Sequence, residues 1–223
     1  MPVVVALFAV TVLLIAAPLA VVLQRARRAS PFTYAVCLAA CLAIMSAAGA
    51  QLLHGAAAVP ALHLPGGLPW IGAHFRMDAL SAFFLLVTNL GGAGASLFAI
   101  GYGAHEQAPG RVLPFYPVFL GAMNLVVLAD DAFSFLVAWE FMSLSSWALV
   151  MAHHHDPDNR SAGYIYIVMA SFGTLTLLLA FGLLAGGAGG YAFADVRSAS
   201  QALPGLVLDP PPVAPASEAP GVK

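Results

Sequence analysis

The sequence contains very little charge for its length. Only 8% of its 223 residues are Asp, Glu, Lys or Arg, and 61% are hydrophobic, which excludes an ordinary water-soluble domain. The formal net charge is −2, and there is no basic run of the kind that binds nucleic acid. These shortages together indicate an integral membrane protein.

Cysteine is nearly absent as well. Cys37 and Cys41 are four residues apart in one expected helix, and this spacing places both thiols on the same face. We therefore expect small packing side chains there rather than a disulfide. The sequence also lacks a nucleophile elbow, a phosphate loop, a dinucleotide fingerprint and a cysteine-rich cluster, so we expect no cofactor in this chain.

Long hydrophobic runs make up most of the chain, each near the ~20 residues that cross a bilayer core of ~30 Å. They predict an all-α, polytopic membrane domain over residues 1–185. About six transmembrane helices are expected, at about 3–23, 32–53, 77–101, 114–130, 132–152 and 162–185. Residues 186–223 are rich in Gly and Pro, and we expect a disordered tail there.

The arginines are distributed unequally between the two sides of this arrangement. The loops after the first, third and fifth runs contain Arg25, Arg27, Arg28, Arg111 and Arg160. The other side has Arg76 and Arg197 near the runs, and the single lysine, Lys223, is at the far end of the tail. The positive-inside rule then places the five arginines in the cytoplasm. We expect a multi-pass protein of the cell membrane with both termini on the non-cytoplasmic side.

Glu140 is an acidic residue well inside an expected membrane helix. It follows the start of its helix by about eight residues, which is about 11 Å along the axis. An ionised carboxylate at that depth costs a few kcal/mol, so it usually faces a protein interior or a hydrated path. Two interpretations compete: a hydrogen-bonded packing residue, or a protonatable station whose charge depends on a nearby cation. We favour the second.

Two further residues are candidates for a proton path. Ser143 lies one turn beyond Glu140, and Asp78 lies at the start of the third helix. A stripe of small and weakly polar residues continues from Asp78 through Asn89 to Ser96, a pattern typical of close helix packing. Asp78 can serve as a helix cap, or it can supply protons to a hydrated path.

Three consecutive histidines are the weak candidates for a metal site. His153, His154 and His155 lie after the fifth helix and before an Asp-Pro turn. Neighbouring histidines in a loop do not all converge on one ion, and no second cluster of ligands is evident in the sequence. We therefore favour a solvated turn and expect no metal.

The segment FLVAWEFMSLSSWALV, which contains Glu140, is similar to a known family. It resembles the Trp-Glu helix of the proton-translocating, antiporter-like membrane subunits of respiratory complex I and Mrp antiporters. The MSLSSW run is most similar to the large membrane subunit, component B, of hydrogenase-4 and formate hydrogenlyase. FRMDALSAFFLLV and GGYAFADVRS add to the resemblance, which covers about residues 70–198.

The resemblance implies a fold of about fourteen helices with inverted repeats, each containing a broken helix. It also implies that the position of Glu140 pairs with a lysine on a seventh helix, and that redox centres belong to other subunits. We therefore expect an N-terminal part of a hydrogenase-4-like or complex I-like membrane subunit, not catalytic alone. Its expected partners are the other membrane subunits. The alternative is a structural multi-pass protein in which Glu140 only stabilises helix packing.

Overall fold

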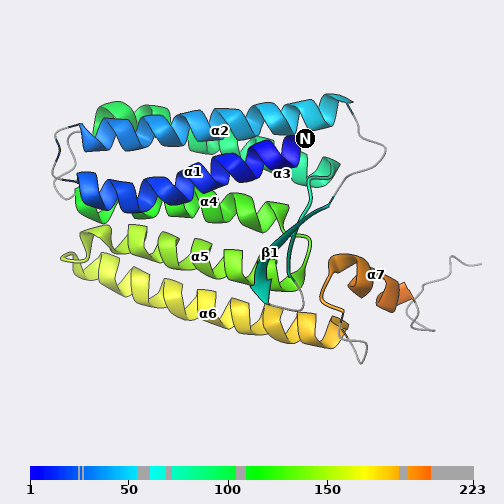
Figure 1. The fold of residues 1–223 in the computed structure, drawn as a ribbon. Helices are drawn as coiled ribbons and strands as arrows, with labels where there is room; N and C mark the ends of the chain where they lie inside the picture. The colour runs from blue at the N-terminus through cyan, green and yellow to red at the C-terminus, as the bar shows by residue number, and fades with distance from the viewer. Residues whose placement is uncertain are drawn as a thin grey trace, which may run out of the picture.

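The computed structural model describes residues 1–24, 26, 28–54, 61–68, 72–103, 109–185 and 190–201. Six helices lie side by side in an elongated bundle, and a seventh, short helix lies at one end of it (Figure 1). The helices are α1 (Pro2–Leu23), α2 (Ala29–His54), α3 (Ala79–Tyr102), α4 (Phe115–Leu128), α5 (Ala132–Val150), α6 (Pro157–Ala185) and α7 (Phe193–Gln201).

Five of these helices, α1, α2, α3, α5 and α6, are long and apolar enough to cross a membrane. The prediction of an all-α, polytopic membrane fold is therefore confirmed. The fourth helix is shorter than the expected run, because α4 has 14 residues and so measures about 21 Å. It ends where Ala129 adopts an extended conformation, which starts the turn into α5.

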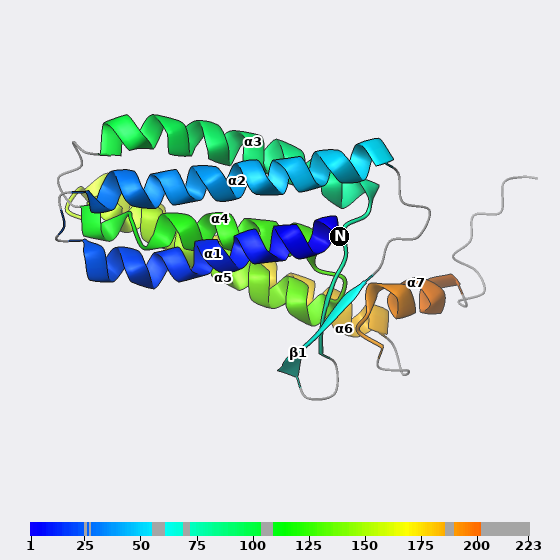
Figure 2. The same cartoon turned by 45° about the horizontal axis from the view of Figure 1, so that its top comes forward.

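The core of the bundle is formed mainly by α1, α2, α3 and α4. Helix α2 packs against α3 and α1, α1 packs against α4, and α4 packs against α5 (Figure 2). Cys37 and Cys41 are free thiols that are fully buried in this core, beside Ile44 and Leu85. Helix α6 packs mainly on α5, and no residue in its most apolar stretch is buried.

A β-hairpin occupies the segment between α2 and α3, where the sequence predicted only a loop. Strand β1 (Leu62–Leu68) pairs antiparallel with β2 (Gly72–Phe75). Gly72 has a φ of 70°, which is accessible to glycine at little cost. Phe75 forms a β-bridge with Ala129, which joins the hairpin to the turn between α4 and α5. Hairpin, N-terminus and α7 all lie at the same end of the bundle (Figure 1).

Part of the region expected to be a disordered tail, residues 193–201, forms a helix. Helix α7 follows a β-bridge between Asp131 and Ala192, and its first residue, Phe193, packs on Phe135 and Phe181. These aromatic contacts attach α7 to the ends of α5 and α6. Residues 202–223, which include the proline-rich stretch and Lys223, lie outside the described residues, as do Arg25 and Arg27.

Candidate functional site

The N-terminus of α5, the helix that contains Glu140, is held by a buried carboxylate. Asp131 is fully buried, and its Oδ1 accepts a hydrogen bond of 2.7 Å from the backbone N–H of Ser134. Its Oδ2 accepts one of 2.7 Å from the Ser134 hydroxyl and one of 2.8 Å from the backbone N–H of His74. The cap therefore fixes both the start of α5 and its contact with the hairpin.

Glu140 lies at a groove between α5 and α6. The groove has a volume of about 350 Å³. It is lined by Phe133, Leu136, Val137, Glu140, Phe141, Leu144, Thr174 and Leu178. Glu140 is partly buried rather than buried, because α6 covers the groove from one side only. Within the described parts of the chain its carboxylate has neither a hydrogen bond nor an ion pair.

The nearest polar neighbours of Glu140 on its own helix form no hydrogen bond with its carboxylate. Ser143 is buried one turn away, and no hydrogen bond joins it to Glu140. Trp139 stacks on Phe135 with ring centroids 5.8 Å apart, and its buried indole N–H has no partner among the residues that the structure describes. Glu140 thus borders a largely apolar groove and is not part of a hydrogen-bond network among the described residues.

The ion pairs of the described residues lie at the hairpin end of the bundle. Arg76 is 3.0 Å from Asp130 and 3.8 Å from Asp78, and His74 is 3.4 Å from Asp131. None of these contacts includes Glu140. These ion pairs therefore gather around the α4–α5 turn, which is typical of a region at the membrane surface.

Asp78 caps α3 and does not contact Glu140. Its Oδ1 accepts a hydrogen bond of 2.8 Å from the backbone N–H of Ser81. Partial burial acts to raise the pKa of this carboxyl, but the hydrogen bonds from Ser81 and the charge of Arg76 outweigh it and lower the pKa. The structure thus gives Asp78 a capping position, while its part in a proton path stays a prediction.

The three consecutive histidines follow α5 in a turn. The short helix Met151–His153 ends there, and the backbone N–H of His154 donates to the carbonyl of Met151. The rings of His154 and His155 have centroids 4.4 Å apart, while the side chain of His153 lies outside the described residues. Across the residues that the structure describes, no three His, Cys, Asp or Glu side chains gather as metal ligands.

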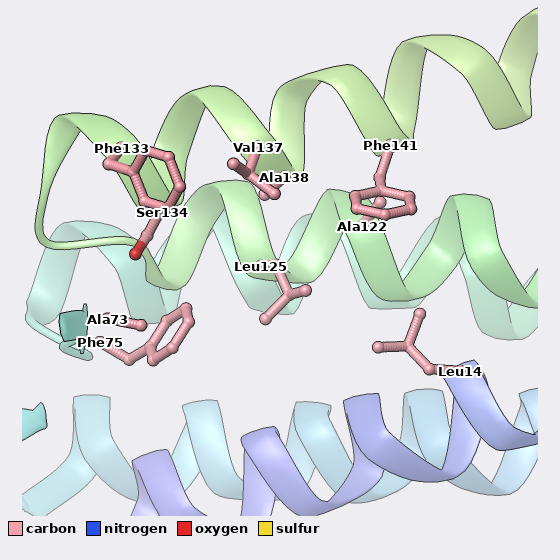
Figure 3. Close-up of a pocket in the computed structure, with 10 residues that line it drawn as sticks. All are labelled: Leu14, Ala73, Phe75, Ala122, Leu125, Phe133, Ser134, Val137, Ala138 and Phe141. Atoms are coloured by element: carbon pink, nitrogen blue, oxygen red, sulfur yellow. The ribbon is translucent and has the colours of Figure 1, made fainter. Parts of the chain in front are cut away.

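A second cavity lies on the other side of α5 and has a volume of about 340 Å³ (Figure 3). Its lining comes from α1, β2, α4 and α5, and consists of Leu14, Ala73, Phe75, Ala122, Leu125, Phe133, Ser134, Val137, Ala138 and Phe141. Ser134 is the one polar side chain in that lining, and its hydroxyl is bound to Asp131. This cavity contains no titratable group, so the groove at Glu140 remains the candidate site.

The sequence did not indicate the contacts that surround Asp131. The signal that could have revealed the cap is an Asp three residues before a serine at the start of a helix, as in Asp131 and Ser134. His74 is 57 residues from Asp131 in the chain, and no local pattern connects them. The sequence likewise missed Asn124, which is fully buried beside Asn89.

Comparison with known proteins gives the class of this fold. The chain has a TM-score of 0.74 with a solved chain of the membrane-bound sulfane sulfur reductase, an archaeal respiratory membrane complex. The match has 22% sequence identity and covers 87% of this chain and 39% of the other. The chain therefore has the polytopic helical fold of part of that membrane chain.

Sequence comparison shows which family this chain resembles. Residues 129–207 match the membrane-domain model described as NADH:quinone oxidoreductase/Mrp antiporter. The chain is 36% identical over 149 residues to an uncharacterised protein of Mycobacterium tuberculosis, covering 66% of this chain and 23% of that protein. It is 37% identical over 133 residues to hydrogenase-4 component B of Escherichia coli, covering 59% and 20%. The chain thus spans less than a quarter of the length of these relatives.

Proposed function

We propose that this chain takes part in proton translocation across the membrane, as a membrane subunit of a hydrogenase-4-like or complex I-like assembly. The observation that carries the proposal is the position of Glu140. It is the one acidic residue well inside the five described membrane helices, it borders a largely apolar groove, and it has no hydrogen-bond or ion-pair partner in the described chain. The match of residues 129–207 to the NADH:quinone oxidoreductase/Mrp antiporter model supports the same function.

The proposed mechanism depends on the charge state of the Glu140 carboxylate. In general, a nearby cation favours the ionised form of a carboxyl group, and its removal favours the protonated form. A group whose proton affinity changes with the distance of a cation can take up a proton in one state and release it in the other. Ser143 and Asp78 are proposed as neighbouring parts of the path.

The cation that this mechanism needs is proposed to lie on a helix of another membrane subunit or of a longer form of this protein. Among the described membrane helices the one cationic residue is Arg160, in the first turn of α6. The outer face of α6 is apolar and uncovered, and the groove at Glu140 opens beside it. A further helix placed there would cover both the groove and α6.

Replacing Glu140 in the assembled membrane complex tests the proposal. We expect Glu140→Gln to abolish coupled proton movement while membrane insertion and assembly are retained. Glu140→Asp keeps a titratable group and is expected to retain part of the activity. Asp158→Asn, in the exposed start of α6, is the matched control and should change nothing. An unchanged proton-to-electron stoichiometry in Glu140→Gln would contradict the proposal.

The proposed orientation places both termini outside the cytoplasm, in the cell membrane. It is supported by the arginine count, which favours cytoplasmic loops after α1, α3 and α5. Single cysteines in a variant without Cys37 and Cys41 can be labelled with a membrane-impermeant thiol reagent in intact cells. Ser198→Cys in α7 should react, and Asp158→Cys should not. The reverse pattern would invert the orientation.

A further inference from the structure

Two histidines face each other across the β-hairpin. His63 of β1 is the register partner of His74 of β2, and their ring centroids are 4.4 Å apart with the rings at 87°. His63 is exposed, and the side chain of His74 is 20% exposed. We propose that this pair binds a divalent transition-metal ion such as Zn²⁺, with water in the remaining coordination positions. The proposal does not depend on a proton path through Glu140.

The separation of the two rings fits shared coordination of one ion. Imidazole nitrogens bind Zn²⁺ at about 2.0–2.1 Å. Two rings held at roughly 90–110° around such an ion have centroids about 4.5–5.3 Å apart. The observed 4.4 Å is just below this range, so the rings start slightly closer together than they would be around the ion. The strands therefore supply the spacing, and the exposed ring of His63 turns about its side-chain bonds to bring a nitrogen to the ion.

The buried carboxylate of Asp131 lies beside the ring of His74. Nδ1 of His74 is inaccessible to solvent and has no hydrogen-bond partner in the described structure, and Oδ2 of Asp131 lies 3.4 Å from it. A carboxylate beside one imidazole nitrogen orients the ring and makes the opposite nitrogen a better metal ligand. Asp131 is held in place by its bonds to Ser134, so this support is rigid.

The charge around the hairpin also favours a cation. Asp78, Asp130 and Asp131 lie there with the guanidinium of Arg76. Helix α7 adds Asp195 and Arg197 at the same end, so carboxylates outnumber guanidiniums in this region and favour the binding of metal ions. The ligand class follows from the donors, since imidazole nitrogens suit Zn²⁺, Ni²⁺ and Cu²⁺ better than Ca²⁺ or Mg²⁺.

Zinc titration of the full chain in lipid nanodiscs, followed by calorimetry, tests the site. His63→Gln and His74→Gln are each expected to weaken Zn²⁺ binding at least about tenfold, because each removes one of two protein ligands. Asp131→Asn should weaken it about 10–100-fold through the orientation of His74. His154→Gln and His155→Gln are the matched controls, since these rings also lie 4.4 Å apart but in a turn after α5, and they should leave the affinity unchanged.

A second readout avoids dependence on the stability of the variants. With Cu²⁺ as the probe, electron paramagnetic resonance of the native chain should show coupling to two imidazole nitrogens. The His63→Gln variant, altered only at an exposed position, should show coupling to one. Three results would each overturn the proposal: no saturable binding in the native chain, a native affinity in the His63→Gln or His74→Gln variant, or loss of binding in the His154→Gln variant.

Discussion

The side-chain nitrogen of Asn89 lies 2.6 Å from the side-chain oxygen of Asn124, between α3 and α4, where both residues are fully buried. Each amide also donates a hydrogen bond of 2.8 Å to the carbonyl four residues earlier in its own helix, at Leu85 and Leu120. The two helices are therefore joined by a polar pair whose donors and acceptors are matched. Such a pair specifies how α3 and α4 are aligned.

Removing one member of this pair should destabilise the bundle more than removing both. In Asn124→Leu the amide of Asn89 keeps its bond to Leu85 but loses its partner across the helices, and we expect a loss of about 0.5–2 kcal/mol. In the double variant, Asn89→Leu with Asn124→Leu, no polar side chain is left without a partner. The loss of stability should therefore be smaller than in the single variant. Unfolding in mixed micelles with increasing SDS measures both. Equal losses in the single and double variants would contradict the paired arrangement.

Replacement of Asp131 should loosen the start of α5. Asp131→Ala removes the side chain that accepts three hydrogen bonds from Ser134 and His74, so we expect a loss of about 2 kcal/mol or more. Hydrogen exchange at the Ser134 amide should become faster. Asp130→Ala is the control, because Asp130 is partly exposed and its side chain is bound to Arg76, and should cost less than about 1 kcal/mol. Similar losses of stability in both variants would contradict a larger contribution from the buried cap.

Stability should fall at low pH in a way that depends on Asp78. Its folded pKa is lowered, so the ionised form stabilises the native state. This contribution is complete above the unfolded pKa of about 3.9 and is lost as the pH falls through the lower folded pKa. Thermal unfolding between pH 3 and 7 is the measurement. Asp78→Asn can still cap α3 but does not titrate, so its profile should be flatter than that of the native chain at the acidic end.

A side chain at Gly92 should disturb the contact between α2, α3 and α4. A Cβ at this position would lie 3.0 Å from the Cys41 sulfur and 3.1 Å from a methyl carbon of Leu120. We expect Gly92→Val to cost about 1–3 kcal/mol through overpacking. Gly91→Val is the matched control, because a Cβ there meets no heavy atom within 4 Å. The two variants share the same change in helix propensity, so equal unfolding midpoints would contradict the packing argument.

Particular elements show which parts of the site the sequence could predict. The resemblance of the helix around Glu140 to antiporter-like subunits was confirmed by the family match over residues 129–207. The sequence placed Glu140 at bilayer depth within its helix, and the structure adds that it is partly buried at a groove. Burial depends on how many helices surround a position, and a single helix sequence does not contain that information.

The sequence by itself determined that this chain is a multi-pass membrane protein, because hydropathy is a local property that each run of ~20 residues expresses on its own. It also indicated the family resemblance, since the residues around Glu140 that carry it are contiguous. Only the tertiary structure decided the hairpin, the Asn89–Asn124 pair and the contact between His74 and Asp131. The two residues of each pair are far apart in the sequence, by 35 positions for Asn89 and Asn124 and by 57 for His74 and Asp131. Contacts between distant segments depend on the packing of the whole bundle, which no local periodicity specifies.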